Sequence, residues 1–349
     1  MTAQPSQRLQ ALDGLRAVSI ALVFLSHIGF GHLFPGGLGV TIFFFISGFI
    51  ITKLMLAEWD ATGSMSIRNF YVRRVFRLTP ALLMFVLSCL GMMTLVGDVW
   101  SWQEVASVFL YFANYYGIYS SFSGELIKQP LAITWSLAVE EHFYFFFPFI
   151  FMGFASVPRR FLVLIATILV AMLAWRIYLV LGIALDNLPH YRIYTGTDTR
   201  ADSILYGAAL SIVLARYPQF FAKLSRLQTF LCGVFLLVLT LAIRNEAFRE
   251  SLRYSLQGVA LFYMFPTLVF EKNALNSFLQ WPPVVYLGRI SYSLYLYHWL
   301  VTHSVAHFLP ETGALLRISL ISLLSLLLAH LSYRYIEQTF QRLGHKLMI

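Results

Sequence analysis

The sequence predicts an all-α, polytopic bundle of membrane-spanning helices. Hydrophobic residues make up 59% of its 349 positions and charged residues only 12%, whereas a soluble domain carries about 25% charged residues. The mean hydropathy is +0.72, and this composition excludes a sizeable soluble domain. The net charge of +9 is spread over loops along the chain, so it does not indicate a nucleic-acid surface.

Ten apolar segments have the length that a bilayer core requires, about 17 to 25 residues. They are residues 12–34, 37–57, 79–98, 131–152, 160–183, 201–217, 227–243, 253–271, 285–308 and 314–336. The stretch 103–119 is short and rich in Tyr and Asn, so we expect an interfacial or re-entrant segment there. As a full span it would reverse the orientation of every later helix.

Cations gather at the N-terminus, in the tail and in the loops that follow every second predicted span. Cytoplasmic loops are enriched in Lys and Arg. The sequence therefore predicts a multi-pass protein of the cell (inner) membrane with both termini in the cytoplasm. The predicted outer loop at 244–253 departs from this rule, because it mixes arginines with glutamates.

No feature of the sequence divides the chain into parts. It has no internal repeat or low-complexity segment, and we expect one integral-membrane domain, 1–349, with no appended soluble domain. The first apolar run is long and lacks a small-residue cleavage site, which favours a retained span over a signal peptide. Cys89 and Cys232 both lie in apolar segments, so no disulfide or metal cluster is expected.

The first predicted span carries the ionisable side chains of Asp13, Arg16 and His27. Such residues are costly inside a membrane and mark functional sites. The eleven residues from Arg16 to His27 are about three helical turns, so these two side chains project from nearly the same face, roughly 16 Å apart along the axis. The alternative is that Arg16 extends to the interface and His27 is a hydrogen-bonded packing residue.

Three arginines crowd one side of a short helix predicted within 66–80. Arg73 and Arg77 are four residues apart, and Arg74 and Arg77 are three apart, so their side chains are neighbours on a helix. Arginine suits ligands that carry several phosphates, which makes these residues candidates for a cytoplasmic phosphate clamp. Ordinary cytoplasmic charge, or a basic helix resting on anionic lipid, would give the same pattern.

The fourth predicted span opens with two adjacent carboxylates, Glu140 and Glu141, followed by His142. Adjacent residues point about 100° apart on a helix, so the two glutamates cannot share a face. Glu140 or His142 is a candidate for proton transfer.

Two later spans also carry polar side chains. Arg200 and Asp202 enter the sixth span with opposite charges, an arrangement suited to hydrogen bonding with hydroxyl-rich ligands. On the ninth span, Tyr295 and His298 belong to one polar stripe, which should face the bundle interior or a wet cavity. His298 is predicted to lie at a depth similar to that of His27.

Together these motifs resemble the membrane acyltransferase family 3, whose members O-acylate polysaccharide, peptidoglycan, lipid-linked sugars or exported small molecules. The similarity runs from about Leu9 to Phe340 and rests on six motifs in the same order. They are Leu-Asp-Gly-Leu-Arg-Ala at 12–17 with a histidine eleven residues past the arginine, a Gly-rich turn and Phe-rich run at 36–49, the arginine segment ending at Pro80, Trp-Ser-Leu-x-x-Glu-Glu at 135–141, Arg-x-Asp at 200–202 and Tyr-Ser-x-Tyr-x-x-His at 292–298.

The resemblance implies an O-acyltransferase that takes an acyl group, most simply acetyl, from acyl-CoA in the cytoplasm. His27 would act as general base on an acceptor hydroxyl or would carry the acyl group, and Glu140 and Glu337 would orient groups or relay protons. The residues implied at the CoA phosphates are Arg16, Arg73, Arg74 and Arg77. The residues implied at the acceptor are Arg200, Asp202, Tyr295 and His298.

The partners follow from the same resemblance. The acceptor would contain sugar, as a polysaccharide, peptidoglycan, a lipid-linked sugar or an exported small molecule. It would be acylated directly or through a separate periplasmic or extracellular transferase. Membrane lipid is the other expected partner, and neither metal nor nucleic acid is expected.

Two other functional classes stay open. Ten spans with intramembrane Arg, Glu and His suit a proton-coupled transporter or exporter of a small or lipid-linked substrate, although the chain lacks an internal repeat. A scaffold that recruits surface-assembly enzymes is the third class. Transport without acyl-CoA consumption would favour the transporter, and tolerance of substitutions at Arg16, His27 and Arg200 would favour the scaffold.

Overall fold

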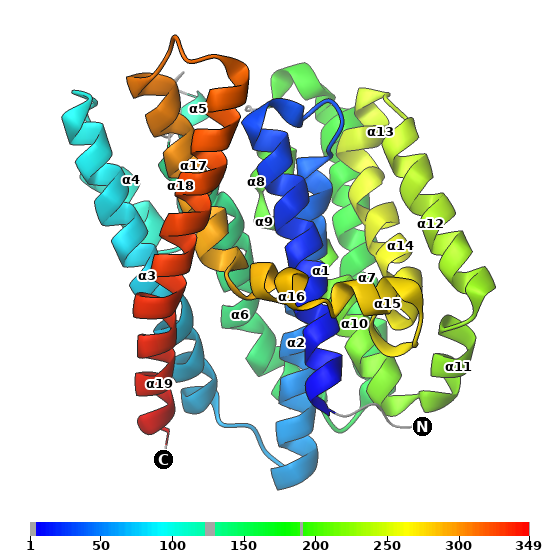
Figure 1. Cartoon of the computed structure of the whole chain (residues 1–349). Helices are drawn as coiled ribbons and strands as arrows, with labels where there is room; N and C mark the ends of the chain where they lie inside the picture. Colours follow the sequence, from blue (N-terminus) through cyan, green and yellow to red (C-terminus); the bar gives the residue numbers. More distant parts are fainter. Residues whose placement is uncertain (1–4, 123–129, 189–190, 349) are drawn as a thin grey trace.

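The computed structural model describes residues 5–122, 130–188 and 191–348. Every regular element within these ranges is helical, and none is a strand, which confirms the all-α class. The long helices run side by side (Figure 1). The beginning of α1 and the end of α19 lie on the same side of the bundle (Figure 1).

Six helical segments among the described residues are long and apolar enough to cross a membrane. They are Gln10–Phe30, Gly36–Thr62, Ile67–Leu95, Leu131–Phe154, Pro158–Ile183 and Ala314–Lys346. A seventh results if Asp202–Arg216 and Pro218–Leu224, which meet at 106°, form one bent span. The protein is therefore a multi-pass membrane bundle. The number of segments that are long and apolar enough to span a membrane is smaller than the expected ten.

The longer helices follow the predicted spans closely. They are α1 (Pro5–Leu25), α2 (Gly36–Thr62), α3 (Ile67–Leu95), α6 (Trp135–Phe154), α7 (Pro158–Tyr178), α10 (Asp202–Arg216), α12 (Leu227–Ala242), α14 (Arg253–Phe270), α17 (Ser291–Phe308) and α18 (Ala314–Leu331). Three of them continue as π-helical turns: η1 (Ser26–Phe30) after α1, η3 (Leu179–Ala184) after α7 and η6 (Ser332–Glu337) after α18.

Shorter helices lie between the long ones, and one follows the last of them. They are α4 (Trp102–Phe109), α5 (Ala113–Phe122), η2 (Leu131–Thr134), η4 (Leu185–Asn187), α8 (Arg192–Thr195), α9 (Thr197–Arg200), η5 (Pro218–Phe220), α11 (Phe221–Leu224), α13 (Glu246–Ser251), α15 (Ala274–Leu279), α16 (Pro282–Arg289) and α19 (Gln338–Lys346). Neither α4 nor α5, which cover most of the stretch 103–119, is long enough to span a bilayer.

One predicted span and one predicted short helix differ from the structure. The segment 285–308 is divided at Ile290 into α16 and α17, and α15 and α16 lie across the long helices instead of along them (Figure 1). The arginine segment is not a separate helix either, because α3 runs without a break through Pro80. The arginines and the span that follows them are therefore one rigid element.

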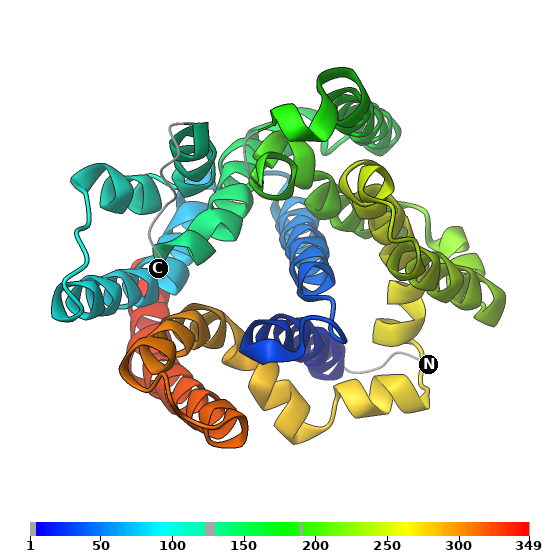
Figure 2. The same ribbon diagram turned by 90° about the horizontal axis from the view of Figure 1, so that it is seen from above.

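Glycines permit the closest helix contacts near the centre of the bundle, where α1 and α2 lie inside the ring of the other helices (Figure 2). A Cβ atom on Gly48 of α2 would overlap the backbone of Ile204, and one on Gly207 of α10 would overlap that of Phe45. Small residues at helix interfaces let backbones approach in this way. A glycine also permits the close contact of α16 with α1, where Gly288 faces the backbone of Asp13.

Candidate active site

His27 and His298 are in direct contact, although 271 positions separate them in the sequence. His27 Nδ1 lies 2.9 Å from His298 Nε2. His27 belongs to the π-helical turn η1, which contains Gly29 at a φ of 113°, a conformation that glycine adopts without strain. Such turns are frequent at functional sites. His298 is fully buried on α17.

The hydrogen bonds of this pair assign its protons. His298 Nδ1 lies 2.9 Å from the carbonyl oxygen of Leu294, which can only accept, so Nδ1 carries the proton and Nε2 is an acceptor. His27 Nδ1 must then donate to His298 Nε2. A neutral imidazole has one N–H, so His27 Nε2 keeps a free lone pair, as a general base or a nucleophile requires.

A cavity of about 270 Å³ adjoins His27. The indole of Trp299 packs edge-on against the His27 ring, with the ring centroids 4.6 Å apart. The other walls include Gly36 and Gly37 of α2 and the ring of Tyr194. This space is called the histidine cavity below.

A second cavity contains three of the four predicted phosphate ligands. Its walls include the charged residue types Arg16, Arg74, Arg77 and Glu140, and it is called the arginine cavity below. Arg73 points elsewhere, because its Nη2 atom lies 3.2 Å from Glu58 Oε2 and 40% of its side chain is exposed. Contact between Arg73 and CoA stays a prediction.

The two cavities adjoin. Val40 and Tyr295 line both of them. The Tyr295 hydroxyl lies 2.7 Å from Ser136 Oγ and donates to the carbonyl oxygen of Ile133 over 3.1 Å. A path between the arginines and His27 therefore has to pass these two side chains.

Glu140 is held in place by a short hydrogen-bonded chain. Ser47 Oγ donates to Glu140 Oε1 over 2.5 Å and lies 2.9 Å from the Tyr144 hydroxyl. The guanidinium of Arg74 stacks on the Tyr144 ring, 3.7 Å from its centroid. Glu140 thus places a carboxyl group beside the three arginines of this cavity.

Glu337 lies near the arginine cavity but does not line it in the described part of the chain. It is buried on η6, and its Oε1 atom accepts a 2.5 Å hydrogen bond from Ser293. A role for Glu337 in proton relay stays a prediction.

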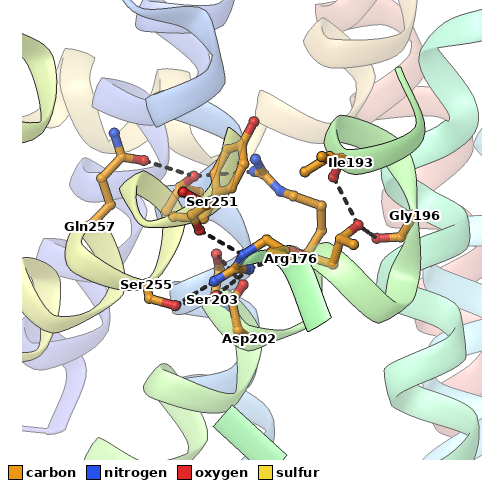
Figure 3. A network of polar contacts seen from close by, with 12 residues as sticks. Arg176, Ile193, Gly196, Asp202, Ser203, Ser251, Ser255 and Gln257 are labelled. Atoms are coloured by element: carbon orange, nitrogen blue, oxygen red, sulfur yellow. Dashed lines mark hydrogen bonds and ion pairs between the residues drawn. The ribbon is translucent and has the colours of Figure 1, made fainter. Parts of the chain in front are cut away.

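Arg200 and Asp202 do not pair with each other. Asp202 Oδ2 accepts a 2.7 Å hydrogen bond from Arg176 Nη1, and both side chains are fully buried. Ser203 donates its backbone N–H to Asp202 Oδ1 over 2.7 Å. Figure 3 shows this network, in which Arg176 of α7 also donates to the backbone oxygens of Thr199 and Ser251.

The sequence predicts that Asp202 contacts the acceptor. In the structure, however, both oxygens of its carboxylate already have protein partners. Its contact with an acceptor stays a prediction. Arg176, its partner, escaped the sequence reasoning, yet an arginine inside the apolar run 160–183 is itself a signal of a buried polar site.

Arg200 is surrounded by aromatic rings. Its guanidinium carbon lies 3.9 Å from the ring centroid of Tyr254 and 5.2 Å from that of Tyr194. Its one hydrogen bond within the described residues runs from Nη2 to Thr41 Oγ1 over 3.2 Å, and Nε and Nη1 are buried without a partner. The cost of such a group makes it a candidate for function.

Asp198, two residues before Arg200, accepts hydrogen bonds from several side chains. It pairs with Arg192 and accepts hydrogen bonds from Trp175 Nε1 over 2.7 Å and from the Tyr115 hydroxyl over 3.1 Å. Burial alone would raise the pKa of its carboxyl, but these bonds and the Arg192 charge outweigh burial and lower the pKa below its ordinary value. Asp198 is therefore anionic near neutral pH.

Comparisons with protein families and with known proteins gave the following matches. The family model described as "Acyltransferase domain" matches residues 9–334. A protein of Staphylococcus aureus strain COL named "Putative O-acetyltransferase" is 29% identical over 97% of this chain and 58% of its own length. The O-acetyltransferase OatA of strain NCTC 8325 / PS 47 is 28% identical with the same coverage. The chain thus spans 58% of the length of these relatives. No solved structure gave a significant match.

Proposed function

Because the chain belongs to the acyltransferase family whose domain matches residues 9–334, we propose that it is a membrane O-acetyltransferase. The donor is acetyl-CoA from the cytoplasm, and the acceptor is a hydroxyl of a sugar-containing molecule on the outer side of the cell (inner) membrane. The arrangement that supports this proposal is the junction of the arginine cavity with the histidine cavity at Val40 and Tyr295.

The arginine cavity suits the phosphates of the donor. Arg16, Arg74 and Arg77 come from two helices and face one space, and guanidinium groups form strong, charge-assisted hydrogen bonds with phosphate. The thioester at the far end of the pantetheine arm then extends past Tyr295 toward His27. Positioning the two reactants in this way removes much of the entropic cost of reaction.

His27 performs the chemistry of transfer. Its Nε2 atom takes the proton of the acceptor hydroxyl while the hydroxyl oxygen attacks the thioester carbonyl carbon. The tetrahedral intermediate collapses, the C–S bond breaks, and the CoA sulfur leaves with the proton that Nε2 had accepted. His298 holds the His27 ring in the tautomer that this step needs.

The test uses purified protein in liposomes, acetyl-CoA and an extract of cell-envelope sugars. We expect release of free CoA thiol and an acetylated product from the wild type, and loss of both in His27→Ala. His32→Ala is the matched control, because His32 is an exposed histidine shortly after η1. Equal activity in His27→Ala would refute the mechanism, and substrate movement without thiol release would favour a transporter.

A further inference from the structure

A third cavity, of about 510 Å³, lies beside the histidine cavity. The two share Gly36, Gly37 and Tyr194 as walls. Its remaining polar walls include arginines of α13 and α14, which belong to the segment 244–253 that breaks the positive-inside pattern. This space is called the outer cavity below, and its volume is typical of a small-molecule site.

Positive charge is in excess behind the wall of this cavity. Three guanidinium carbons lie within 6 Å of the Tyr254 ring centroid: Arg200 at 3.9 Å, Arg253 at 4.9 Å and Arg176 at 5.7 Å. Arg176 is neutralised by Asp202. Arg253 has a longer pair, 3.4 Å, with Glu250.

Arg200 has no acidic partner among the described residues. The three arginines around Tyr254 therefore face two carboxylates and retain one positive charge. Two arginines also have buried nitrogen atoms without a hydrogen-bond partner among the described residues. These atoms are Nε and Nη1 of Arg200, and Nε of Arg253.

The other charges nearby do not remove this excess. Arg192 is neutralised by Asp198. Arg249 and Glu246, both exposed and both lining the outer cavity, balance one another. A buried charge without a counterion is strongly unfavourable, so the uncompensated guanidinium charge favours an anion from outside the chain.

We propose that the outer cavity binds the acceptor through a negatively charged group on a sugar, a carboxylate or a phosphate. The group pairs with Arg253, which of the three arginines around Tyr254 is the one that lines this cavity in the described structure, while a hydroxyl of the same molecule extends past Gly36 and Gly37 to His27. That the bound molecule is the acceptor rests on the proposed function, whereas the preference for an anion is inferred from the charges alone. The donor phosphates have a separate site at Arg16, Arg74 and Arg77.

The test measures equilibrium binding without acetyl-CoA, on wild-type protein in nanodiscs of neutral lipid. The probes are glucuronate, its uncharged methyl ester, glucose 6-phosphate and glucose. We expect at least one acidic sugar to bind about tenfold or more tightly than its uncharged counterpart, because charge-assisted hydrogen bonds are roughly twice as strong as neutral ones. Preference for glucuronate or for the phosphate identifies the anionic group. Equal binding of charged and uncharged sugars, or no saturable binding, would overturn the proposal.

Variants locate the anion. Arg253→Gln should abolish the preference for the acidic sugar, and Arg253→Lys should retain part of it. Arg244→Gln is the control, because Arg244 is an exposed arginine of the same segment that does not line the outer cavity in the described structure. Preference that persists unchanged in Arg253→Gln would place the anion elsewhere and overturn the assignment.

A separate assay of thiol release distinguishes the two proposals. Acidic sugars that bind preferentially but never become acetylated would refute the transfer reaction and leave the anion site standing. Equal acetylation of glucuronate and its methyl ester at equal concentrations would leave the transfer reaction standing and refute the anion preference.

Discussion

Replacing His298 by phenylalanine tests the proposed role of the histidine pair. Phenylalanine keeps an aromatic ring in contact with the neighbours of His298, such as Phe24, whose ring centroid lies 5.8 Å away. It removes Nε2, the acceptor of the proton on His27 Nδ1. That proton then has no partner, and His27 gains by moving it to Nε2, which is the atom that must act as base.

The magnitude follows from the lost hydrogen bond. Leaving a buried donor unsatisfied costs about 1 to 3 kcal/mol, and each 1.4 kcal/mol is about a tenfold change in an equilibrium. The share of His27 in the productive tautomer should therefore fall roughly 5- to 150-fold. We expect kcat for thiol release to fall by a similar factor, with KM for acetyl-CoA unchanged because the arginine cavity is intact.

His303→Phe provides the matched control. His303 lies on the same helix and, like His298, bonds through Nδ1 to the carbonyl oxygen four residues earlier, at 2.8 Å. It makes no hydrogen bond to His27 within the described structure, so its replacement should leave kcat within about twofold. A kcat for His298→Phe as high as that of His303→Phe, or a change confined to KM, would refute the assignment of the protons.

Three further predictions concern other parts of the site. Arg74→Gln should raise KM for acetyl-CoA about tenfold in thiol-release assays, because it removes a charge-assisted contact to phosphate, whereas Arg73→Gln should not; equal effects would contradict the observed side-chain directions. Asp202→Asn should destabilise the protein by about 3 to 5 kcal/mol, since it leaves a buried arginine without a counterion. Scanning fluorimetry would show this as a lower unfolding temperature, and an unchanged value would refute it. Val40→Phe should close the junction of the two cavities and abolish transfer while acetyl-CoA still binds in a filter assay; Val163→Phe, at an exposed position of α7, should do neither.

The sequence predicted most long helices and the polar residues of the site, but not their contacts. Hydropathy located α2, α6 and α14 to within a few residues, since apolar length is a local property. It missed the division at Ile290, because the short polar interruption formed by Gly288, Arg289 and Ser291 does not by itself show that a helix ends there. The division is determined by the packing of α16 across α1. The residues close to the division do not reveal this packing.

The partners of the charged residues likewise depend on tertiary packing, which local sequence patterns do not show. Arg200 and Asp202 are two positions apart, and residues at that spacing do not face each other on a helix, so they could not have paired. Asp202 instead pairs with Arg176 of a different helix. Arg73 and Arg74 are adjacent and point about 100° apart, which is why only Arg74 lines the arginine cavity.

The position of Arg16 and His27 on one continuous helical segment has a consequence for the donor. Residues Gln10–Phe30 form one helical segment long enough to span a membrane, so the distance from Arg16 to His27 is set by helical rise, roughly 16 Å along the axis. Side-chain rearrangement cannot shorten it appreciably. A thioester anchored by its phosphates at Arg16 therefore needs a long, extended arm to bring its carbonyl carbon to His27. Acyl-CoA has such an arm, whereas a short thioester without phosphates could approach His27 only unanchored, without the positional advantage that the arginines provide.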